Sequence, residues 1–340
     1  MTDRRANLEL HEREMAGGAV RLASAPLTLQ IEPTSVCNLE CGICGRQYWD
    51  SLRNPPGEMP AWVLARIEPV LPSLVELVIG GYAEATLARN LWTVLEAARR
   101  SDCPTRLITN GTRLDERMCA RLVEAGLAHL VVSIDGAREP TLRKNRGIGL
   151  EETLSGFDRM SAAAKAAGVA PPRFHISFTA TRSNVGELAE LVDLAADRGV
   201  AEIRAGHLKI YARELDSESL FHDVDAARAA LGRARERSEA RGVTLGLPGF
   251  ERRGADCLMP FQMLFVKWNG KVLGCCSAVF ENDKYSFPVG DLADRSLLEI
   301  WNDAKILSYR QALRGQGAYP EQCTNCAFRF DTYDAHLRLL

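Results

Sequence analysis

The stretch Cys37-Asn38-Leu39-Glu40-Cys41-Gly42-Ile43-Cys44 puts three cysteines on one short loop. It follows an apolar run at Leu27–Ile31 and the segment Glu32–Val36. Three thiolates spaced in this way can hold three corners of a cubane iron–sulfur cluster. No fourth cysteine lies nearby, so the fourth iron would stay open to an exogenous ligand. Zinc is the alternative, but zinc knuckles usually pair two Cys-x-x-Cys units and need a fourth Cys or His locally. The pattern therefore favours a reactive 4Fe–4S cluster on Cys37, Cys41 and Cys44.

Short apolar runs alternate with amphipathic segments along the chain around this loop. We predict strands near Leu27–Ile31, Val75–Ile79, Arg106–Thr109, Leu130–Ser133, Phe174–Thr179 and Glu202–His207. Apolar residues at helical spacing predict helices at Leu91–Arg100, Asp115–Ala125, Leu150–Ala167 and Val185–Arg198. Repeated βαβ units form a parallel sheet, here either open or an incomplete barrel. In both cases the chemistry belongs at the carboxyl ends of the strands.

The composition is that of a soluble globular protein. Of the 340 residues, 46% are hydrophobic and 25% charged, which suffices for a large core. Lys and Arg number 42 against 44 Asp and Glu, a net charge of −2 that gives no electrostatic footprint for nucleic acid or an anionic membrane. The polar N-terminus has no apolar stretch of signal-peptide length. We therefore expect a cytoplasmic protein with no nucleic-acid or membrane partner, whose ten cysteines stay reduced.

The cysteine loop after the first strand resembles that of the radical S-adenosylmethionine (SAM) enzymes, which carry a C-x3-C-x2-C motif at this place in a partial (β/α)6 barrel. The resemblance covers roughly residues 27–210. It implies that the open iron chelates SAM, and that one electron from the cluster cleaves SAM to methionine and a 5′-deoxyadenosyl radical. That radical removes a hydrogen atom from the substrate. An external donor such as flavodoxin or ferredoxin would supply the electron.

Shorter motifs behind successive strands strengthen the resemblance and imply the SAM contacts. Gly80-Gly81-Tyr82-Ala83-Glu84-Ala85 resembles the family's Gly-Glu-Pro segment, with Glu84 as the ligand of the SAM amino group. This copy has Ala83 for Gly and Ala85 for Pro, and Ile43 stands where many members have an aromatic residue. The remaining motifs are Asn110-Gly111, Ser133-Ile134-Asp135-Gly136 and Arg146-Gly147. The implied cofactor-binding residues are Tyr82, Ala83, Glu84, Asn110, Ser133, Asp135 and Arg146.

A second set of cysteines, Cys257, Cys275, Cys323 and Cys326, follows a change of sequence texture. Four thiolates complete a 4Fe–4S cluster without an open iron, although structural zinc is also compatible with them. A hairpin with an Asn269-Gly270 turn precedes Cys275, and a helix is expected at Ser296–Arg314. Behind a radical SAM core, this arrangement resembles the small α+β Twitch module, a shortened SPASM domain. We therefore expect two 4Fe–4S clusters and SAM as cofactors.

The predicted domains are an N-terminal arm at 1–26, a radical SAM partial barrel at 27–215, a linker helix region at 216–249 and an auxiliary cluster module at 250–340. The arm is expected to form one helix on the outside. The linker is expected to be a solvated connecting helix at Asp223–Arg241.

The spare thiol Cys276 separates the possible reactions. It is either a small buried hydrophobe or a hydrogen-atom donor that quenches a substrate radical and inverts its stereocentre. We predict epimerisation of a polar small molecule such as a sugar, cyclitol or aminoglycoside, with Cys276 as a catalytic residue. Three alternatives stay open: dehydrogenation of a secondary alcohol, with the auxiliary cluster as electron acceptor; modification of a ribosomal peptide, which the short arm disfavours; and a zinc-stapled, non-enzymatic binding module. Cys103 and Cys119 are expected to be packing residues.

Polar residues near the strand ends or the cysteine loop are the candidates for substrate contact. They are Arg46, Tyr48, His175, Ser177, Arg182, Arg204 and His207.

Overall fold

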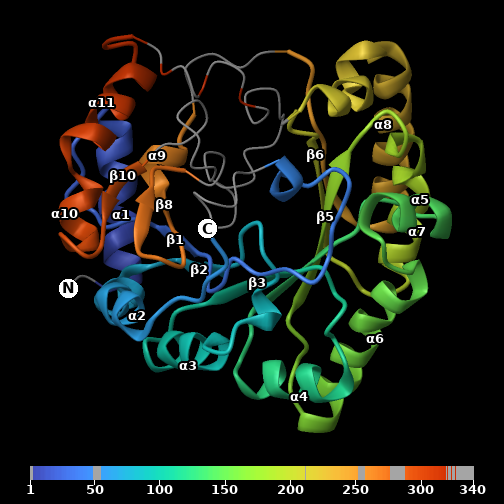
Figure 1. Cartoon of the computed structure of the whole chain (residues 1–340), viewed down its shortest axis with the longest axis horizontal. Coiled ribbons are helices and arrows are strands. Elements are labelled where there is room, and N and C mark those ends of the chain that lie inside the picture. Colours follow the sequence, from blue (N-terminus) through green and yellow to red (C-terminus); the bar gives the residue numbers. More distant parts are fainter. Residues whose placement is uncertain are drawn as a thin grey trace.

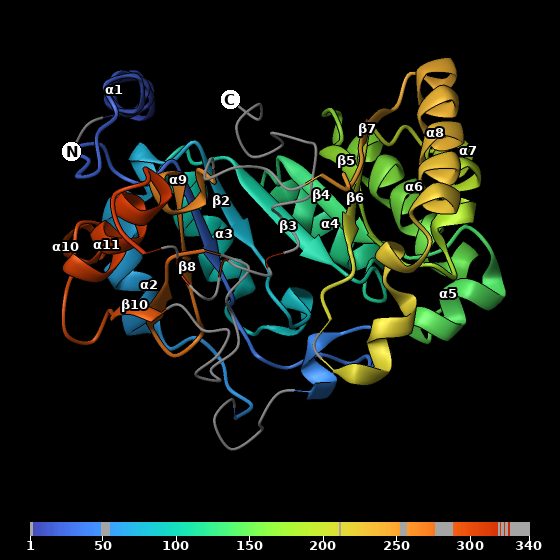
Figure 2. The same ribbon diagram turned by 90° about the horizontal axis from the view of Figure 1, so that it is seen from above.

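The core of the protein is a single sheet that follows an arc (Figures 1 and 2). The computed structural model describes residues 3–48, 55–210, 212–251, 257–275, 288–318, 320, 323 and 326. The strands are β1 Thr28–Ile31, β2 Glu76–Ile79, β3 Thr105–Thr109, β4 His129–Ser133, β5 Arg173–Ala180, β6 Glu202–His207, β7 Thr244–Gly246, β8 Met263–Val266, β9 Lys271–Leu273 and β10 Pro288–Asp291. Their order across the ten-stranded sheet is β10-β9-β8-β1-β2-β3-β4-β5-β6-β7.

Parallel pairing dominates the sheet, as expected for repeated βαβ units. β8 and β1 through β7 are all paired in parallel, while β9 is antiparallel to β8 and β10 to β9. All four residues of β2 are buried, because helices cover one face and the barrel interior the other. The six predicted strands are confirmed as β1 to β6, and the fold is the predicted α/β partial barrel.

Helices cover the outer side of the arc (Figure 2). They are α1 Arg4–Ala16, α2 Ala61–Ile67, α3 Leu91–Arg100, α4 Glu116–Glu124, α5 Glu139–Arg146, α6 Leu150–Ala167, α7 Leu188–Ala196, α8 Val224–Arg241, α9 Met259–Gln262, α10 Leu297–Trp301 and α11 Ala304–Leu313. The bounds of α3 and α6 are as predicted. At α4, the side chain of Asp115 accepts a hydrogen bond from the Met118 N–H and so caps the first turn.

The predicted linker is part of the barrel. α8 packs beside α7 (Figure 1), and it buries Ala227, Leu231 and Ala234. It leads into β7, which extends the sheet beyond β6. The alanines, which made this segment resemble a solvent-exposed helix in the sequence, are small enough to pack against α7. At the opposite edge, β8 pairs with β1, so the sheet also continues into the C-terminal region. The four domain boundaries stay a prediction.

The C-terminal hairpin is confirmed, whereas the helix after it is divided. Gly270 turns β8 into β9 at a φ of +88°. The expected helix at Ser296–Arg314 is instead α10 and α11. Asn302 interrupts it, because its side chain exchanges hydrogen bonds with the backbone of Leu22. Asp303 then caps α11 through the Lys305 N–H.

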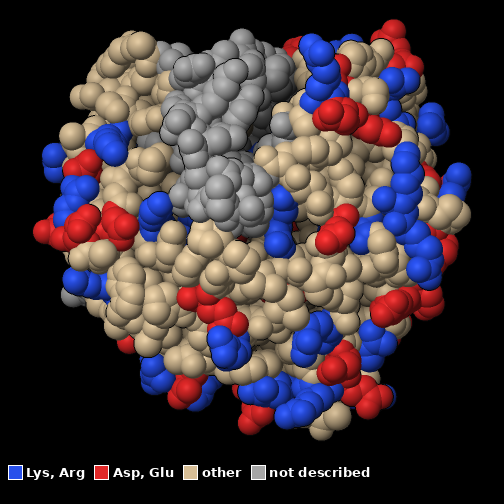
Figure 3. Space-filling view, viewed as in Figure 1, with Lys and Arg blue, Asp and Glu red and all other residues tan. Residues whose placement is uncertain are grey.

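The N-terminal arm forms the expected helix, α1, which is fastened to the barrel by polar contacts. Asn7 donates to the Ser73 carbonyl at 3.1 Å, and Arg4 donates to the Leu74 carbonyl at 2.7 Å. On the face shown in Figure 3, acidic and basic side chains are interspersed over the described surface. Within the described residues, no helix is both long and apolar enough to cross a membrane.

Candidate active site

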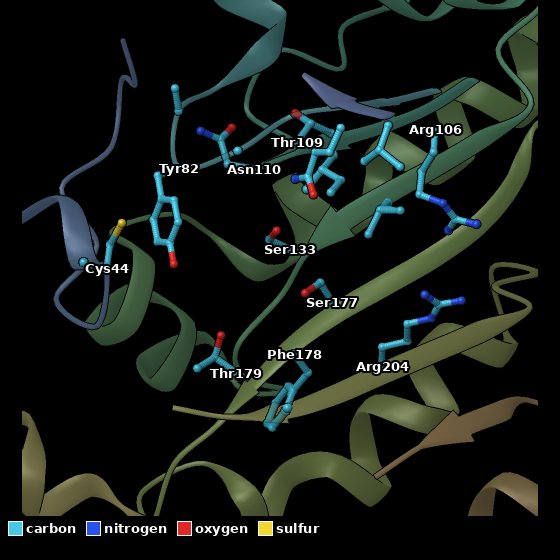
Figure 4. A pocket seen from close by; sticks show the side chains of 18 of the residues that line it. Cys44, Tyr82, Arg106, Thr109, Asn110, Ser133, Ser177, Phe178, Thr179 and Arg204 are labelled. Atoms are coloured by element: carbon cyan, nitrogen blue, oxygen red, sulfur yellow. The ribbon is translucent and has the colours of Figure 1, made fainter. Parts of the chain in front are cut away.

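A cavity of about 460 Å³ occupies the inside of the arc. Inward-facing residues of β1 to β6 form its wall, and Cys37, Cys41 and Cys44 lie together at one end. Figure 4 shows Cys44 and Tyr82 at this end, with Ser133, Ser177 and Thr179 further along the wall. The loop after the first strand therefore presents its thiols at the carboxyl ends of the strands, as predicted.

The cysteine loop is held by the turn that follows β3. The Asn110 side-chain amide donates to Asn38 Oδ1 at 3.0 Å and lies 3.9 Å from Cys37 Sγ. Asn38 in turn donates to the Thr112 hydroxyl at 2.9 Å. Burial raises the pKa of Cys41 to about 11, and it also raises the pKa of Cys44. Both are therefore neutral thiols until a metal displaces their protons. Three half-buried thiols gathered on one loop fit the open 4Fe–4S cluster.

Glu84 stabilises the turn after β2. Its side chain is buried, and both oxygens are occupied by protein donors. Oε1 accepts from the Thr86 N–H at 3.1 Å and from the Thr86 and Thr109 hydroxyls at 2.6 and 2.7 Å. Oε2 accepts from the Asn110 N–H at 2.7 Å. The carboxylate thus holds the Tyr82–Glu84 turn against the Asn110 turn. Tyr82 and Ala83, in the same turn, also line the cavity.

Asp135 and Arg146 form a buried ion pair beside the cysteines. Arg146 Nε donates to Asp135 Oδ2 at 2.6 Å, and the Thr179 N–H donates to Oδ1 at 2.6 Å. Burial works to lower the pKa of Arg146, but Asp135 and the neighbouring Cys41 raise it, so the guanidinium stays charged. Asp135 therefore positions Arg146, which faces Cys41 and Cys44. A fixed cation at this point suits an anionic cluster or a carboxylate of the cofactor.

Tyr82 projects into the cavity between Cys44 and Ser133 (Figure 4). The Lys209 ammonium, from the segment after β6, donates to the Tyr82 hydroxyl at 3.4 Å. This contact joins residues from opposite sides of the cavity, because Tyr82 follows β2 and Lys209 follows β6.

A row of charged and imidazole side chains crosses the cavity near the amino ends of the strands. From β2 to β6, short contacts link neighbouring side chains. They join Arg106 to Glu76 at 2.8 Å, His129 Nδ1 to His175 Nε2 at 2.9 Å, His175 Nδ1 to Glu202 at 2.9 Å, and Arg204 to Glu202 at 2.7 Å. Burial, together with Arg106, His175, Arg173 and Arg204, lowers the pKa of His129 to about 4. Both imidazoles are therefore neutral, since burial lowers the pKa of His175 as well.

The predicted substrate contacts divide into two groups. Arg46, His175, Ser177, Arg204 and His207 line the cavity, whereas Tyr48 and Arg182 do not. Arg182 instead donates to the Ser217 carbonyl at 3.0 Å. The sequence interpretation missed Glu76, Arg106, His129 and Glu202. Each is a charged or imidazole residue in or beside a predicted strand, at a position that faces the barrel interior. This pattern could have identified them from the sequence.

The four cysteines of the second set are all half-buried; they are Cys257, Cys275, Cys323 and Cys326. Burial raises the pKa of Tyr309 to about 12, with further contributions from Cys323 and Cys275, so both sulfurs lie near this phenol. Cys276 lies outside the described residues. Cys103 and Cys119 are buried in the core, as packing residues are.

The comparisons with known proteins agree with this geometry. Residues 31–195 match the model of the radical SAM superfamily, and residues 257–327 match SPASM, an iron–sulfur cluster-binding domain. The chain is similar to the PqqA peptide cyclase of Gluconobacter oxydans, with 26% identity over 90% of this chain and 84% of the relative. It is also similar to mycofactocin maturase MftC of Mycobacterium ulcerans, with 29% identity over 61% of this chain and 54% of the relative. The crystal structure of Streptococcus suis SuiB bound to precursor peptide SuiA has a TM-score of 0.67 at 16% identity, covering 89% of this chain and 70% of that one, and shows the shared fold.

The prediction of small-molecule epimerisation is wrong. Three relatives that match about nine-tenths of this chain are named for peptide cyclisation, not for epimerising a sugar, cyclitol or aminoglycoside. That prediction depended on the spare thiol Cys276. It also counted the short N-terminal arm against a peptide substrate. The length of the arm, however, does not determine which substrate the barrel can accept.

Proposed function

We propose that this chain, which belongs to the radical SAM superfamily and carries a SPASM domain, modifies a peptide by removing a hydrogen atom from one of its residues. The proposal is carried by one observation: three of the relatives that align over about nine-tenths of the chain are named PqqA peptide cyclase. The proposal of peptide modification replaces both the predicted epimerisation and the zinc-stapled, non-enzymatic binding module.

The cofactors are SAM and 4Fe–4S clusters, which fit the thiols described above. When bound, the reduced cluster and SAM together supply the hydrogen-abstraction chemistry of the superfamily. Cys37, Cys41 and Cys44 would hold the first cluster, and the cysteines of the second set would hold an auxiliary one. An external one-electron donor is general for such enzymes.

The residues beside the cysteines would bind and orient SAM. The Glu84 N–H donates to the Val36 carbonyl at 3.0 Å, so the turn at Tyr82 and Ala83 lies beside the cysteine loop and would offer backbone carbonyls to an ammonium group. Arg146, held by Asp135, would face a carboxylate, and Asn110 and Ser133 would provide polar contacts on the same wall. These roles keep the predicted cofactor set but give Glu84 and Asp135 the task of positioning rather than direct contact.

The shape of the cavity agrees with a peptide substrate. At about 460 Å³ it falls within the range of small-ligand pockets. A peptide needs to insert only the side chain that is modified, while the rest of the peptide stays outside the barrel. Ser177 lies further along the wall than Tyr82, where an inserted side chain would pass (Figure 4).

Isotope transfer tests the class of substrate directly. Cells that make this protein are grown in deuterated medium, and their peptide fraction and small-metabolite fraction are separated. Each is incubated anaerobically with reconstituted enzyme, unlabelled SAM and reductant, and 5′-deoxyadenosine is analysed by mass spectrometry. We expect deuterium in 5′-deoxyadenosine with the peptide fraction. Deuterium arriving from the metabolite fraction and not from the peptides would contradict the proposal.

A further inference from the structure

Three neighbouring strands, β2, β3 and β4, repeat one pattern on the face that lines the cavity. A charged or imidazole residue near the amino end of each strand is followed two positions later by a branched aliphatic residue: Glu76 by Val78, Arg106 by Ile108, and His129 by Val131. Alternate residues of a strand lie on the same face of the sheet. Val78, Ile108 and Val131 therefore form an apolar band, one step nearer the cysteines than the charged row.

The apolar band faces the cavity and is separate from the packed core. Val78 and Val131 are 8% and 7% exposed, Ile108 is half-buried, and all three line the cavity. Within the described part of the chain, the continuous apolar core includes their strand neighbours Leu107 and Leu130, which point to the other face, but no residue of the band. Apolar side chains that face a cavity lack the dispersion contacts of close packing, and an apolar ligand would supply them.

Apolar surface also connects the band with the cysteine end of the cavity. Phe265, from β8, lines the cavity, and Tyr82 packs against it. Tyr82 in turn lies between Cys44 and Ser133 (Figure 4). A side chain that enters from the cysteine end would therefore pass an aromatic surface before it meets the band.

The row of charged residues beyond the band is already neutralised by its own contacts. Each carboxylate is paired with a guanidinium: Glu76 with Arg106 at 2.8 Å, and Glu202 with Arg204 at 2.7 Å. Both ring nitrogens of His175 are engaged, Nδ1 by Glu202 and Nε2 by His129, each at 2.9 Å. The two imidazoles are neutral. A charged side chain inserted to this depth would lose its hydration without gaining a counter-charge, which costs free energy.

We propose that the peptide residue which gives up its hydrogen atom has an uncharged, mainly apolar side chain, aliphatic or aromatic, that packs against Val78, Ile108 and Val131. The inference rests on the proposed peptide substrate and specifies its chemistry. The apolar band selects the inserted side chain, and the neutralised row beyond it limits how far that side chain enters.

Selective unlabelling identifies the residue that gives up the hydrogen atom. Cells that make this protein are grown in deuterated medium, one culture with unlabelled Val, Leu, Ile, Met, Phe, Tyr and Trp, and another with unlabelled Lys, Arg, Asp and Glu. The peptide fraction of each is incubated anaerobically with reconstituted wild-type enzyme, unlabelled SAM and reductant. We expect the apolar supplement to remove deuterium from 5′-deoxyadenosine and the charged supplement to leave most of it. Removal by the charged supplement alone, or by neither, would overturn the inference.

A culture without supplement separates this inference from the proposed function. If its peptide fraction transfers deuterium and the apolar supplement leaves that transfer intact, the peptide substrate stands and only the inference fails. If its peptide fraction transfers no deuterium, the proposed function fails and the inference fails with it.

Val131→Thr tests the apolar band itself, because threonine has nearly the shape of valine but adds a hydroxyl. The readout is the ratio of deuterated to undeuterated 5′-deoxyadenosine, formed from the peptide fraction of the unsupplemented culture. Partial misfolding lowers both products and leaves this ratio intact. We expect the ratio to fall about tenfold, since burying the hydroxyl against an apolar side chain costs free energy. The matched control is Val169→Thr, at a position that is 53% exposed, and it should keep the wild-type ratio. An unchanged ratio in Val131→Thr would overturn the role of the band.

Discussion

At the scale of single residues, two buried carboxylates hold the turns of the site together. Glu84 and Asp135 both line the cavity and both accept hydrogen bonds from protein donors, and their contact with SAM stays a prediction. The motifs in the sequence place both residues after strands, and the structure has them there. The sequence could not reveal which atoms the carboxylates contact, since their partners Thr109 and Thr179 come from other strands.

Glu84→Gln should therefore weaken the fold as well as SAM binding. Glutamine offers one carbonyl oxygen where Glu84 accepts four hydrogen bonds, so at least one buried donor loses its partner. We expect a loss of about 1–3 kcal/mol in the free energy of unfolding, measured by urea denaturation, and a higher Kd for SAM by equilibrium dialysis. Glu190→Gln, at an exposed position, serves as the control. Unchanged stability with reduced SAM affinity would instead indicate direct contact.

The buried histidines predict how stability depends on pH. Burial lowers the pKa of both His11 and His129 to about 4, against about 6.5 in an unfolded chain. Between these values the unfolded chain binds more protons, so stability falls as pH decreases from about 6.5 to about 4. Urea denaturation at pH 7 and pH 5 measures the loss. His129→Gln should show a smaller loss than the wild type, and an equal loss would contradict the assignment to this residue.

At the scale of elements, the amphipathic helices and buried strands could be predicted from periodicity alone, and α3 and α6 have the predicted bounds. Two features could not. α8 has a surface rich in Ala and Arg, and only the position of α7 decides that Ala227, Leu231 and Ala234 are buried. The division between α10 and α11 depends on Asn302 contacting Leu22, a residue far away in the sequence.

The hairpin turn at Gly270 gives an element-scale prediction. Gly270 has a φ of +88°, and a Cβ there would lie 2.5 Å from the Trp62 ring. Gly270→Ala should therefore cost about 1–3 kcal/mol of unfolding free energy through backbone strain and the clash, as measured by thermal or urea denaturation. Gly232→Ala is the matched control, because it lies within α8 with open space around it and should be neutral or stabilising. Equal effects of the two substitutions would contradict the account of the turn.

At the scale of the whole molecule, one sheet joins the two cysteine sets. The three cysteines after β1 face the cavity, and Cys275 follows β9, which is linked through β8 to β1. The sequence showed both sets but not this continuity, because pairing between β8 and β1 joins segments more than two hundred residues apart.

Removing either cysteine set should remove only its own iron. Two 4Fe–4S clusters give about eight irons per chain. Cys41→Ala should lower the content to about four irons and abolish SAM cleavage. Cys275→Ala should also lower the content to about four, but should leave reductive SAM cleavage in place. Iron and sulfide assays of anaerobically purified protein measure both effects, and Cys103→Ala is the control with full iron content. Two zinc ions and no sulfide would contradict the cluster assignment.

The most direct test of the central claim is whether the enzyme cleaves SAM. Anaerobically reconstituted protein is mixed with SAM and dithionite, and 5′-deoxyadenosine is quantified by chromatography and mass spectrometry. We predict 5′-deoxyadenosine and methionine in equal amounts from the wild type, and none from Cys44→Ala. Wild-type protein that holds its iron and sulfide yet forms no 5′-deoxyadenosine would contradict the assignment.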